Sequence, residues 1–211
     1  MASEASKLIT AIIAQGAVPL FKAAGFRKTR LNFERTRGEV VQVVDFQLSA
    51  YNFGETWRFF VNFGLAVDRI WEAMEGSPRP PRLKAFMCPV HGRAHDVVPG
   101  AMKQWDVTAA TDGDALAAQL AGVIAALIAR LDQARTVEDL VTGGWLEAGA
   151  HLITRGRIQY AVGNRAAARV DLGAAARFFA DHFPDRRGMT LADLIERHGL
   201  IELGGAIEDR Q

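Results

Sequence analysis

The chain has 211 residues, 49% of them hydrophobic, with 25 basic and 24 acidic residues and a formal net charge of +1. This balance does not point to nucleic acid, an anionic membrane or a strongly acidic molecule as partner. The length suits one large domain or a domain with a helical extension. One cysteine excludes an internal disulfide, and we find no signal peptide and no apolar run of about 18 residues. We therefore expect a cytoplasmic protein without a membrane span.

The first segment, Ser3–Ala24, has apolar residues at helical spacing and is expected to form an amphipathic helix on a sheet. Pro19 is expected to kink this helix or to begin a second short one, and Gly25 to end it. Three strands are predicted next, over residues 26–36, 39–51 and 56–67. The turn signals between them are Arg37-Gly38 and Asn52-Phe53-Gly54.

A register closed on these turns pairs apolar side chains on one face of the predicted sheet. It sets Phe46 opposite Val61, and it places Leu31 beside Val44 and Phe33 beside Gln42. The opposite face then carries a polar row, Arg30–Asp45–Asn62. An ordinary solvated face with a cross-strand ion pair explains this row. A ligand or partner surface is the alternative, and its candidate residues are Arg30, Asp45, Gln47, Arg58, Phe60 and Asn62.

The opening of the chain resembles a known family. The segments that carry the resemblance are Gly25-Phe26-Arg27-Lys28, Val41-Gln42-Val43-Val44-Asp45-Phe46-Gln47 and Phe59-Phe60-Val61-Asn62-Phe63-Gly64. They are similar to the bacterial domain-of-unknown-function family numbered 4304, over about residues 5–140 and most clearly over 25–67. Asp45 and Phe63 depart from the family pattern, where Asn and Leu are expected. The resemblance implies a fold and a polar signature of Gln47, Asn62 and Gly64, but no reaction.

The densest cluster of reactive side chains lies in the segment Met87–Asp96, which we predict to be a loop. Cys88, His91 and His95 have a spacing that could wrap around zinc, although a closed structural site needs four ligands. Cys88 and His91 could instead form a nucleophile pair, but no third orienting group is identifiable. A polar loop with one incidental thiol is the simplest interpretation.

The rest of the chain is expected to be mainly helical. Residues 103–107 predict a further strand with Trp105 packed on the sheet, and Thr111 or Asp112 caps a long helix. Gly143-Gly144 is the predicted boundary between a sheet domain, 1–143, and a helical extension, 144–211. Gly163 marks the turn of one tetratricopeptide-like hairpin, which serves as a packing solution or, alternatively, as a partner groove.

The sequence thus predicts an α+β fold, an antiparallel meander of three to four strands with helices on one face, and a C-terminal all-helical subdomain. Common catalytic motifs are absent, which favours a non-enzymatic role without deciding it. We expect a binding or interaction module, of an immunity or regulatory type, with a protein partner or a small polar ligand and no nucleic acid. No cofactor is expected. The alternative is a metal- or cysteine-dependent hydrolase centred on Cys88, His91 and His95, with zinc as its metal.

Overall fold

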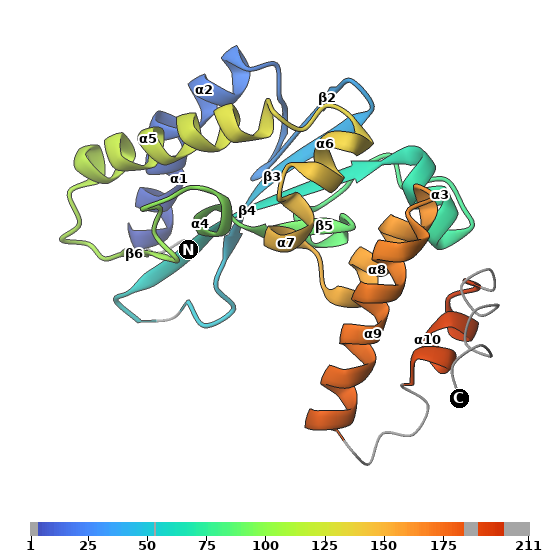
Figure 1. Cartoon of the computed structure of the whole chain (residues 1–211). Coiled ribbons are helices and arrows are strands. Elements are labelled where there is room, and N and C mark those ends of the chain that lie inside the picture. Colours follow the sequence, from blue (N-terminus) through green and yellow to red (C-terminus); the bar gives the residue numbers. More distant parts are fainter. Residues whose placement is uncertain (1–3, 53, 184–189, 201–211) are drawn as a thin grey trace. The chain divides into compact units, whose positions relative to one another are not determined.

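The computed structural model describes residues 4–52, 54–183 and 190–200 (Figure 1). The chain divides into two compact units. Unit 1 comprises Met1–Ala66 and Pro80–Gly149, and unit 2 comprises Val67–Arg79 and Ala150–Gln211. The predicted boundary lay at Gly143-Gly144.

Unit 1 is built on a six-stranded sheet with the order β1-β2-β3-β4-β5, and β6 also pairs with β4. The strands are β1 (Arg27–Thr29), β2 (Asn32–Arg37), β3 (Val40–Leu48), β4 (Trp57–Val67), β5 (Val90–Arg93) and β6 (Trp105–Val107). The predicted α+β class and antiparallel meander are confirmed, with more strands than the three or four expected.

The segment predicted as one strand, 26–36, is a hairpin of β1 and β2, so that prediction was wrong. The chain reverses at Arg30, which has a positive φ of 58°, and Thr29 pairs with Asn32. The backbone O of Leu31 then accepts a hydrogen bond from Phe46 N. A non-glycine residue rarely takes this conformation, and no glycine marked the turn in the sequence.

The predicted register between the first two long strands was also wrong, by two residues. Phe33 pairs with Val44, and Arg35 pairs with Gln42. The turn therefore centres on Gly38-Glu39, where Gly38 has a φ of 58° and a Cβ would collide with Arg135 O. Because a shift of two residues keeps each side chain on its face, the predicted alternation of buried and exposed faces survives.

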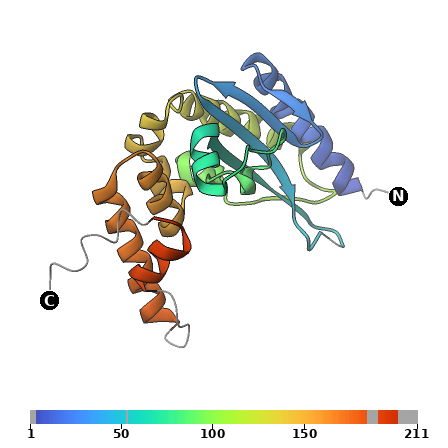
Figure 2. The same cartoon turned by 90° about the vertical axis from the view of Figure 1, so that its right-hand side faces the viewer.

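Three helices cover one face of the sheet: α1 (Glu4–Gly16), α2 (Val18–Ala23) and α5 (Gly113–Leu131) (Figures 1 and 2). The predicted second short helix is confirmed, since α2 begins with Pro19 in its first turn and Gly25 follows with a φ of 83°. Between helices and sheet runs a chain of ring contacts with centroids 4.4–6.1 Å apart, through Phe21, Phe33, Phe46, Phe59 and Trp105.

The same side of unit 1 holds a buried polar network. Gln42 is fully buried and donates to the carbonyl oxygens of Leu131 (2.7 Å) and Ala134 (2.8 Å), at the end of α5. Arg35 is 6% exposed, and its Nε donates to Gln42 Oε1 at 2.8 Å. Its two other nitrogens donate to Ala24 O, after α2, and to Asp132 Oδ1. Two helix ends are thereby tied to adjacent strands.

A short segment crosses one end of the opposite face of the sheet. Its 3₁₀ helix η1 (Ala85–Met87) is flanked by Leu83 and Cys88, both buried. Gly64 lies beneath this segment, and a Cβ there would stand 2.7 Å from Cys88 Sγ and 2.8 Å from Ala85 O. Glycine at this position is therefore required by close approach.

The segment 87–96, predicted as a loop, contains β5 and the helix α4 (Ala94–Val97), so that prediction was wrong. β5 pairs with β4, which sets His91 opposite Gly64 and Arg93 opposite Asn62. Four residues are too few to show a periodicity that distinguishes a strand from a loop. Unit 1 ends with α6 (Val137–Thr142) and α7 (Trp145–Gly149), and Thr136 forms a capping box with Asp139 at the start of α6.

Unit 2 contains α3 (Asp68–Glu75), α8 (Leu152–Ala161), α9 (Arg165–His182) and α10 (Leu191–Arg197). The hairpin of α8 and α9 turns at Gly163, with a φ of 83°, as predicted. At Gly156 a Cβ would stand 2.6 Å from Leu172 and 3.3 Å from Ala168 O. Glycine at this position therefore allows α8 and α9 to pack closely.

In the described part of the chain, one helix, α5, is long and apolar enough to cross a membrane by length and composition. Its buried side chains, Ala117, Leu120, Ile124, Leu127 and Leu131, form an apolar stripe along one side of the helix.

We expect Gln42→Leu to lower the free energy of unfolding by at least about 2 kcal/mol, because Leu131 O, Ala134 O and Arg35 Nε lose a buried partner. Urea unfolding followed by tryptophan fluorescence measures this loss. Gln119→Leu, on an exposed position of α5, is the matched control and should change stability by less than about 0.5 kcal/mol. Equal stabilities of the two variants would refute the role assigned to Gln42.

Gly64→Ala is expected to cost about 1–3 kcal/mol, since the added methyl overlaps Cys88 Sγ and the backbone of Ala85. The control is Gly122→Ala in α5, where a Cβ meets nothing within 4 Å. It should stabilise the protein by about 0.5–1 kcal/mol through helix propensity. Thermal unfolding compares the two, and a neutral Gly64→Ala would contradict the packing described.

Candidate functional site

Five of the six predicted site residues lie on the sheet face away from α1, α2 and α5. They are Asp45 and Gln47 on β3, and Arg58, Phe60 and Asn62 on β4, which alternate with buried residues of the helix-covered face. We call these five, together with Arg93 and Asp106 described below, the polar face.

Arg30, the sixth predicted residue, does not belong to this row. It lies in the β1–β2 turn with an exposed side chain, and Asn32 is the residue that pairs with Asp45. The predicted Arg30–Asp45 cross-strand pair was therefore wrong, because the reversal at Arg30 shortens the strand that would have carried it.

Asn62 is the centre of the polar face. Its side-chain amide nitrogen donates to Asp45 Oδ1 at 2.7 Å and lies 3.3 Å from Gln47 Oε1. Its Oδ1 accepts from Arg93 Nη1 at 2.8 Å. One amide therefore links side chains of β3, β4 and β5, and its orientation follows from these partners.

Arg93 is a member of the polar face that sequence reasoning missed. Its guanidinium carbon lies 4.0 Å from the centroid of the Phe60 ring, a stacked cation–π contact. Burial lowers the pKa of Arg93, while the carboxylates of Asp45 and Asp96 act in the opposite direction. The pairing of β5 with β4 brings Arg93 to this face, opposite Asn62. Arg93 could have been found from the sequence only if residues 90–93 had been predicted to be a strand.

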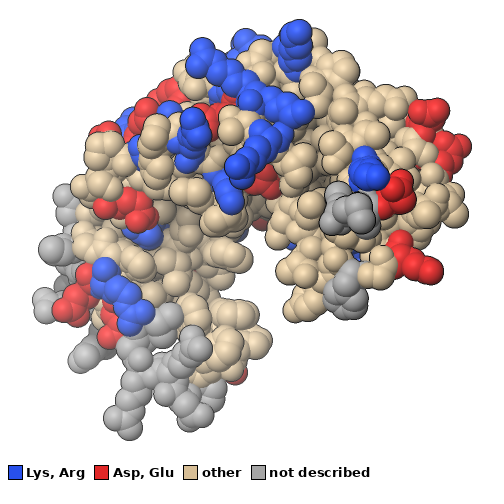
Figure 3. All heavy atoms as spheres, turned by 180° about the vertical axis from the view of Figure 1, so that it is seen from behind, with Lys and Arg blue, Asp and Glu red and all other residues tan. Residues whose placement is uncertain are grey.

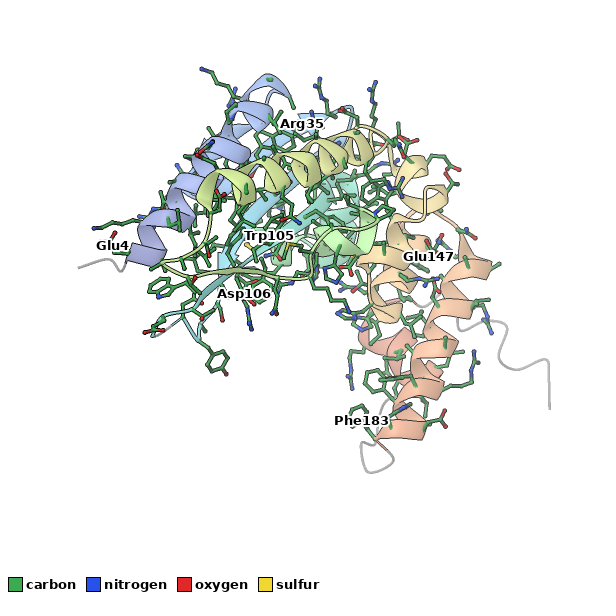
Figure 4. All side chains as sticks on the ribbon, turned by 90° about the vertical axis from the view of Figure 1, so that its left-hand side faces the viewer. Glu4, Arg35, Trp105, Asp106, Glu147 and Phe183 are labelled. Atoms are coloured by element: carbon green, nitrogen blue, oxygen red, sulfur yellow. The ribbon has the colours of Figure 1, made fainter. Side chains whose placement is uncertain are left out.

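Arg58 pairs with Asp106 of β6, the second residue that sequence reasoning missed. Arg58 Nε and Nη2 lie 2.5 and 3.1 Å from the two carboxylate oxygens. The hydrogen bond from Arg58 lowers the pKa of Asp106, and the same bond raises the pKa of Arg58. Trp105 lies toward the helices and Asp106 away from them, as Figure 4 shows. The pair is half exposed, so its contribution to stability is small.

Asp45 holds the segment that crosses the sheet. While Oδ1 accepts from Asn62, Oδ2 accepts from the backbone N of Ala85 at 2.9 Å. The carboxylate is therefore occupied on both oxygens by hydrogen bonds within unit 1. Asp45 thus holds both Asn62 and the backbone of the crossing segment in place.

The Cys88, His91 and His95 side chains have separate surroundings. Cys88 is 2% exposed, and its Sγ lies 3.6 Å from Lys84 O. His91 Nδ1 lies 2.7 Å from Cys88 O, and His95 Nε2 lies 3.3 Å from an Asp96 oxygen. Across residues 4–52, 54–183 and 190–200, no group of three or more His, Cys, Asp or Glu side chains is arranged to hold a metal ion.

Asn62→Ala is expected to cost about 1–2 kcal/mol of stability, because Asp45 and Arg93 each lose a partly buried partner. It should also raise the mobility of the Arg93 side chain, measured by relaxation of its Nε–H group. Gln47→Ala is the control, since its exposed amide makes one long bond and its loss should cost less than about 0.5 kcal/mol. An unchanged Arg93 signal in Asn62→Ala would contradict the role of Asn62 as the centre of this face.

Comparison with known proteins adds a family but no activity. No curated protein and no solved structure matches the chain significantly. Residues 17–134 match the family described as a domain of unknown function (DUF4304), and this match lies inside the range, about 5–140, over which the resemblance was noted. It includes β1 to β6, the helices α2 and α5, and the whole polar face. The chain therefore belongs to the DUF4304 family.

Proposed function

We propose that the protein is a non-catalytic binding module that docks an acidic segment of a partner protein on its polar face. The observation that carries this proposal is the fixed Arg93 guanidinium, stacked on Phe60 and bonded to Asn62. Of its five N–H donors, one is used by the bond to Asn62. An arginine held in this way loses little side-chain entropy when a carboxylate binds it.

The chemistry of the partner follows from which groups on the polar face are already used. The carboxylate of Asp45 is bonded to Asn62 and to Ala85 N, and that of Asp106 is bonded to Arg58 and Gln104. What the face offers a partner is mainly N–H donors, from Arg93 and from the exposed amide of Gln47. Carboxylates of a partner fit such a donor-rich face.

Aromatic side chains beside these donors favour a protein as the partner. Phe60 lies half-buried under Arg93, and Phe86, which is 67% exposed, directly follows Ala85. Arginine and aromatic residues are enriched among the side chains that dominate protein–protein binding energies. The polar face combines both kinds on adjacent strands, Phe60 on β4 and Arg93 on β5, and Phe86 adds a further aromatic residue from the segment that crosses the sheet.

The charge states of the polar face suit binding better than proton transfer. General acid–base catalysis requires a group whose pKa lies near neutrality. The pKa of Asp106 is lowered, and that of its partner Arg58 is raised. Both shifts move away from neutrality and keep the pair charged.

The hydrolase centred on Cys88, His91 and His95 remains a prediction from the sequence. Burial of the Cys88 thiol does not favour it, because a nucleophilic cysteine is usually accessible and thiolate-stabilised. Our proposal includes neither zinc nor another cofactor, and we retain the cytoplasm as the proposed location.

The test is selection of a displayed library of random peptides on the intact protein. We expect acidic peptides to be enriched and to bind Arg93→Met and Phe60→Ala at least about tenfold more weakly, as for side chains at the centre of an interface. Arg93→Lys should give an intermediate loss, since it keeps the charge without the planar fork. Lys103→Gln, an exposed change elsewhere in unit 1, should bind as the wild type does.

Two results would refute the proposal. One is the enrichment of peptides that bear no acidic residues. The other is an acidic peptide that binds Arg93→Met as tightly as it binds the wild type, which would place its site elsewhere. Circular dichroism of each variant shows whether a loss of binding comes from unfolding.

A further inference from the structure

Unit 1 carries a second surface whose chemistry differs from that of the polar face. Exposed cations come from the end of α2, from the β1–β2 hairpin, from the end of β2 and from the segment before η1. We call this surface the basic edge and define it by Lys22, Arg27, Lys28, Arg30, Arg37 and Arg82.

Most cations of the basic edge have no acidic partner in the described part of the chain. Among the described residues, Arg37 is the one cation of the basic edge in an ion pair, with its Nε 3.9 Å from Asp132, which Arg35 already binds at 2.8 Å. Arg27 lies opposite Glu34 in the β1–β2 register but forms no ion pair with it. Between residues 22 and 37, the one acid is Glu34, and its Oε2 lies 3.3 Å from the backbone N of Leu83. The net charge of +1 for the whole chain therefore conceals a local excess of positive charge.

This excess is visible on the surface. Figure 3 shows Lys and Arg side chains gathered at the top of the view, the part of the molecule where Figure 1 places α2 and β2. Unpaired cations at close range repel one another, and this repulsion lowers the stability of the folded protein unless an anion binds between them. Edge-strand cations also prevent pairing between sheets, but that role does not account for Lys22 or Arg82, which lie outside the strands.

A depression of about 380 Å³ lies within the basic edge. Arg27, Arg35 and Arg37 line it, together with Gly25, Thr36 and two neighbours of these, Ala24 and Glu34. Two of the arginines are held in place. Arg35 stacks on Phe26 at 4.3 Å, and Arg37 Nη2 donates to Ala24 O at 3.3 Å.

The surroundings select the class of anion. Phe26, just before β1, is 7% exposed and lies under Arg35, and Phe33 of β2 is 1% exposed, so neither can serve as an anchor for a protein partner. What remains is a small concave surface lined by three guanidinium groups and one carboxylate, that of Glu34, with the ammonium groups of Lys22 and Lys28 elsewhere on the basic edge. Guanidinium forks bind phosphoryl oxygens bidentately, and several cations in a row match repeated phosphates.

We propose that the basic edge binds phosphoryl groups, with Arg27 and Arg37 as the contacting side chains in the depression. Two sources share this chemistry, a small polyphosphate and the backbone of a single-stranded nucleic acid. A small polyphosphate would occupy only the depression, whereas a single-stranded nucleic acid would also reach Lys28, Arg30 and Arg82. This inference does not depend on the function proposed for the polar face.

Calorimetric titration of the intact protein with inorganic tripolyphosphate and with oligo(dT) tests the proposal at low and moderate salt. We expect Arg27→Gln/Arg37→Gln to weaken tripolyphosphate binding by about tenfold or more, because two charge-assisted contacts are lost. If oligo(dT) also binds, the magnitude of the slope of log K against log salt concentration should fall by about 1.4 in this variant, at about 0.7 for each lost phosphate contact. Binding of tripolyphosphate without oligo(dT) would identify the small source.

Lys103→Gln is the control, since it removes an exposed charge of unit 1 outside the basic edge. The proposal is overturned if the wild type binds neither ligand, if the double variant binds both unchanged, or if Lys103→Gln weakens binding equally. Tighter binding of polyglutamate than of tripolyphosphate would also overturn it, in favour of an acidic polypeptide. Arg93→Met should leave tripolyphosphate binding intact, which separates this test from that of the polar face.

Discussion

One buried amide holds unit 1 together at the point where helices and sheet meet. Gln42 satisfies two carbonyl oxygens at the end of α5 and accepts from Arg35, which in turn reaches Ala24 after α2 and Asp132 after α5. A buried polar group is costly without partners, so these residues constrain one another. The hydrogen bonds of Gln42 and Arg35 therefore hold the ends of α2 and α5 against β2 and β3.

The two faces of the sheet are closed by different means. On the helix side, aromatic rings from β2, β3, β4 and β6 fill the space under α1, α2 and α5. On the other side, the segment around η1 lies directly on Gly64, and Asp45 holds its backbone. Because this segment crosses only one end of the face, the side chains around Asn62 stay outside the apolar core. Position, rather than unusual composition, makes them candidates for binding.

Unit 1 thus presents two surfaces with different electrostatics. On the polar face, acids and bases neutralise one another around Asn62, and an oriented Arg93 keeps unused donors. On the basic edge, cations outnumber acids, and the single acid of the hairpin, Glu34, lies against a backbone N–H of the crossing segment. The first arrangement favours a partner with matching shape and carboxylates, while the second favours phosphoryl groups and a strong dependence on salt. The DUF4304 match includes both surfaces.

The sequence by itself determined the local structure of this protein. Alternation in β3 and β4, the apolar stripe of α5, the cap at Thr136 and the turn at Gly163 are all features of neighbouring residues, and periodicity and capping reveal them. Tertiary structure decided the reversal at Arg30, the two-residue shift at Gly38-Glu39 and the pairing of β5. None of these has a strong local signal, because each depends on contacts with distant residues such as Phe46, Arg135 and Gly64. The residues of the candidate site also fall into two groups, those that the sequence places on the polar face and those that only the tertiary structure brings there. Alternation alone placed Asp45, Gln47, Arg58, Phe60 and Asn62 on one face, but only the pairing of β4 with β5 and β6 brought Arg93 and Asp106 to them.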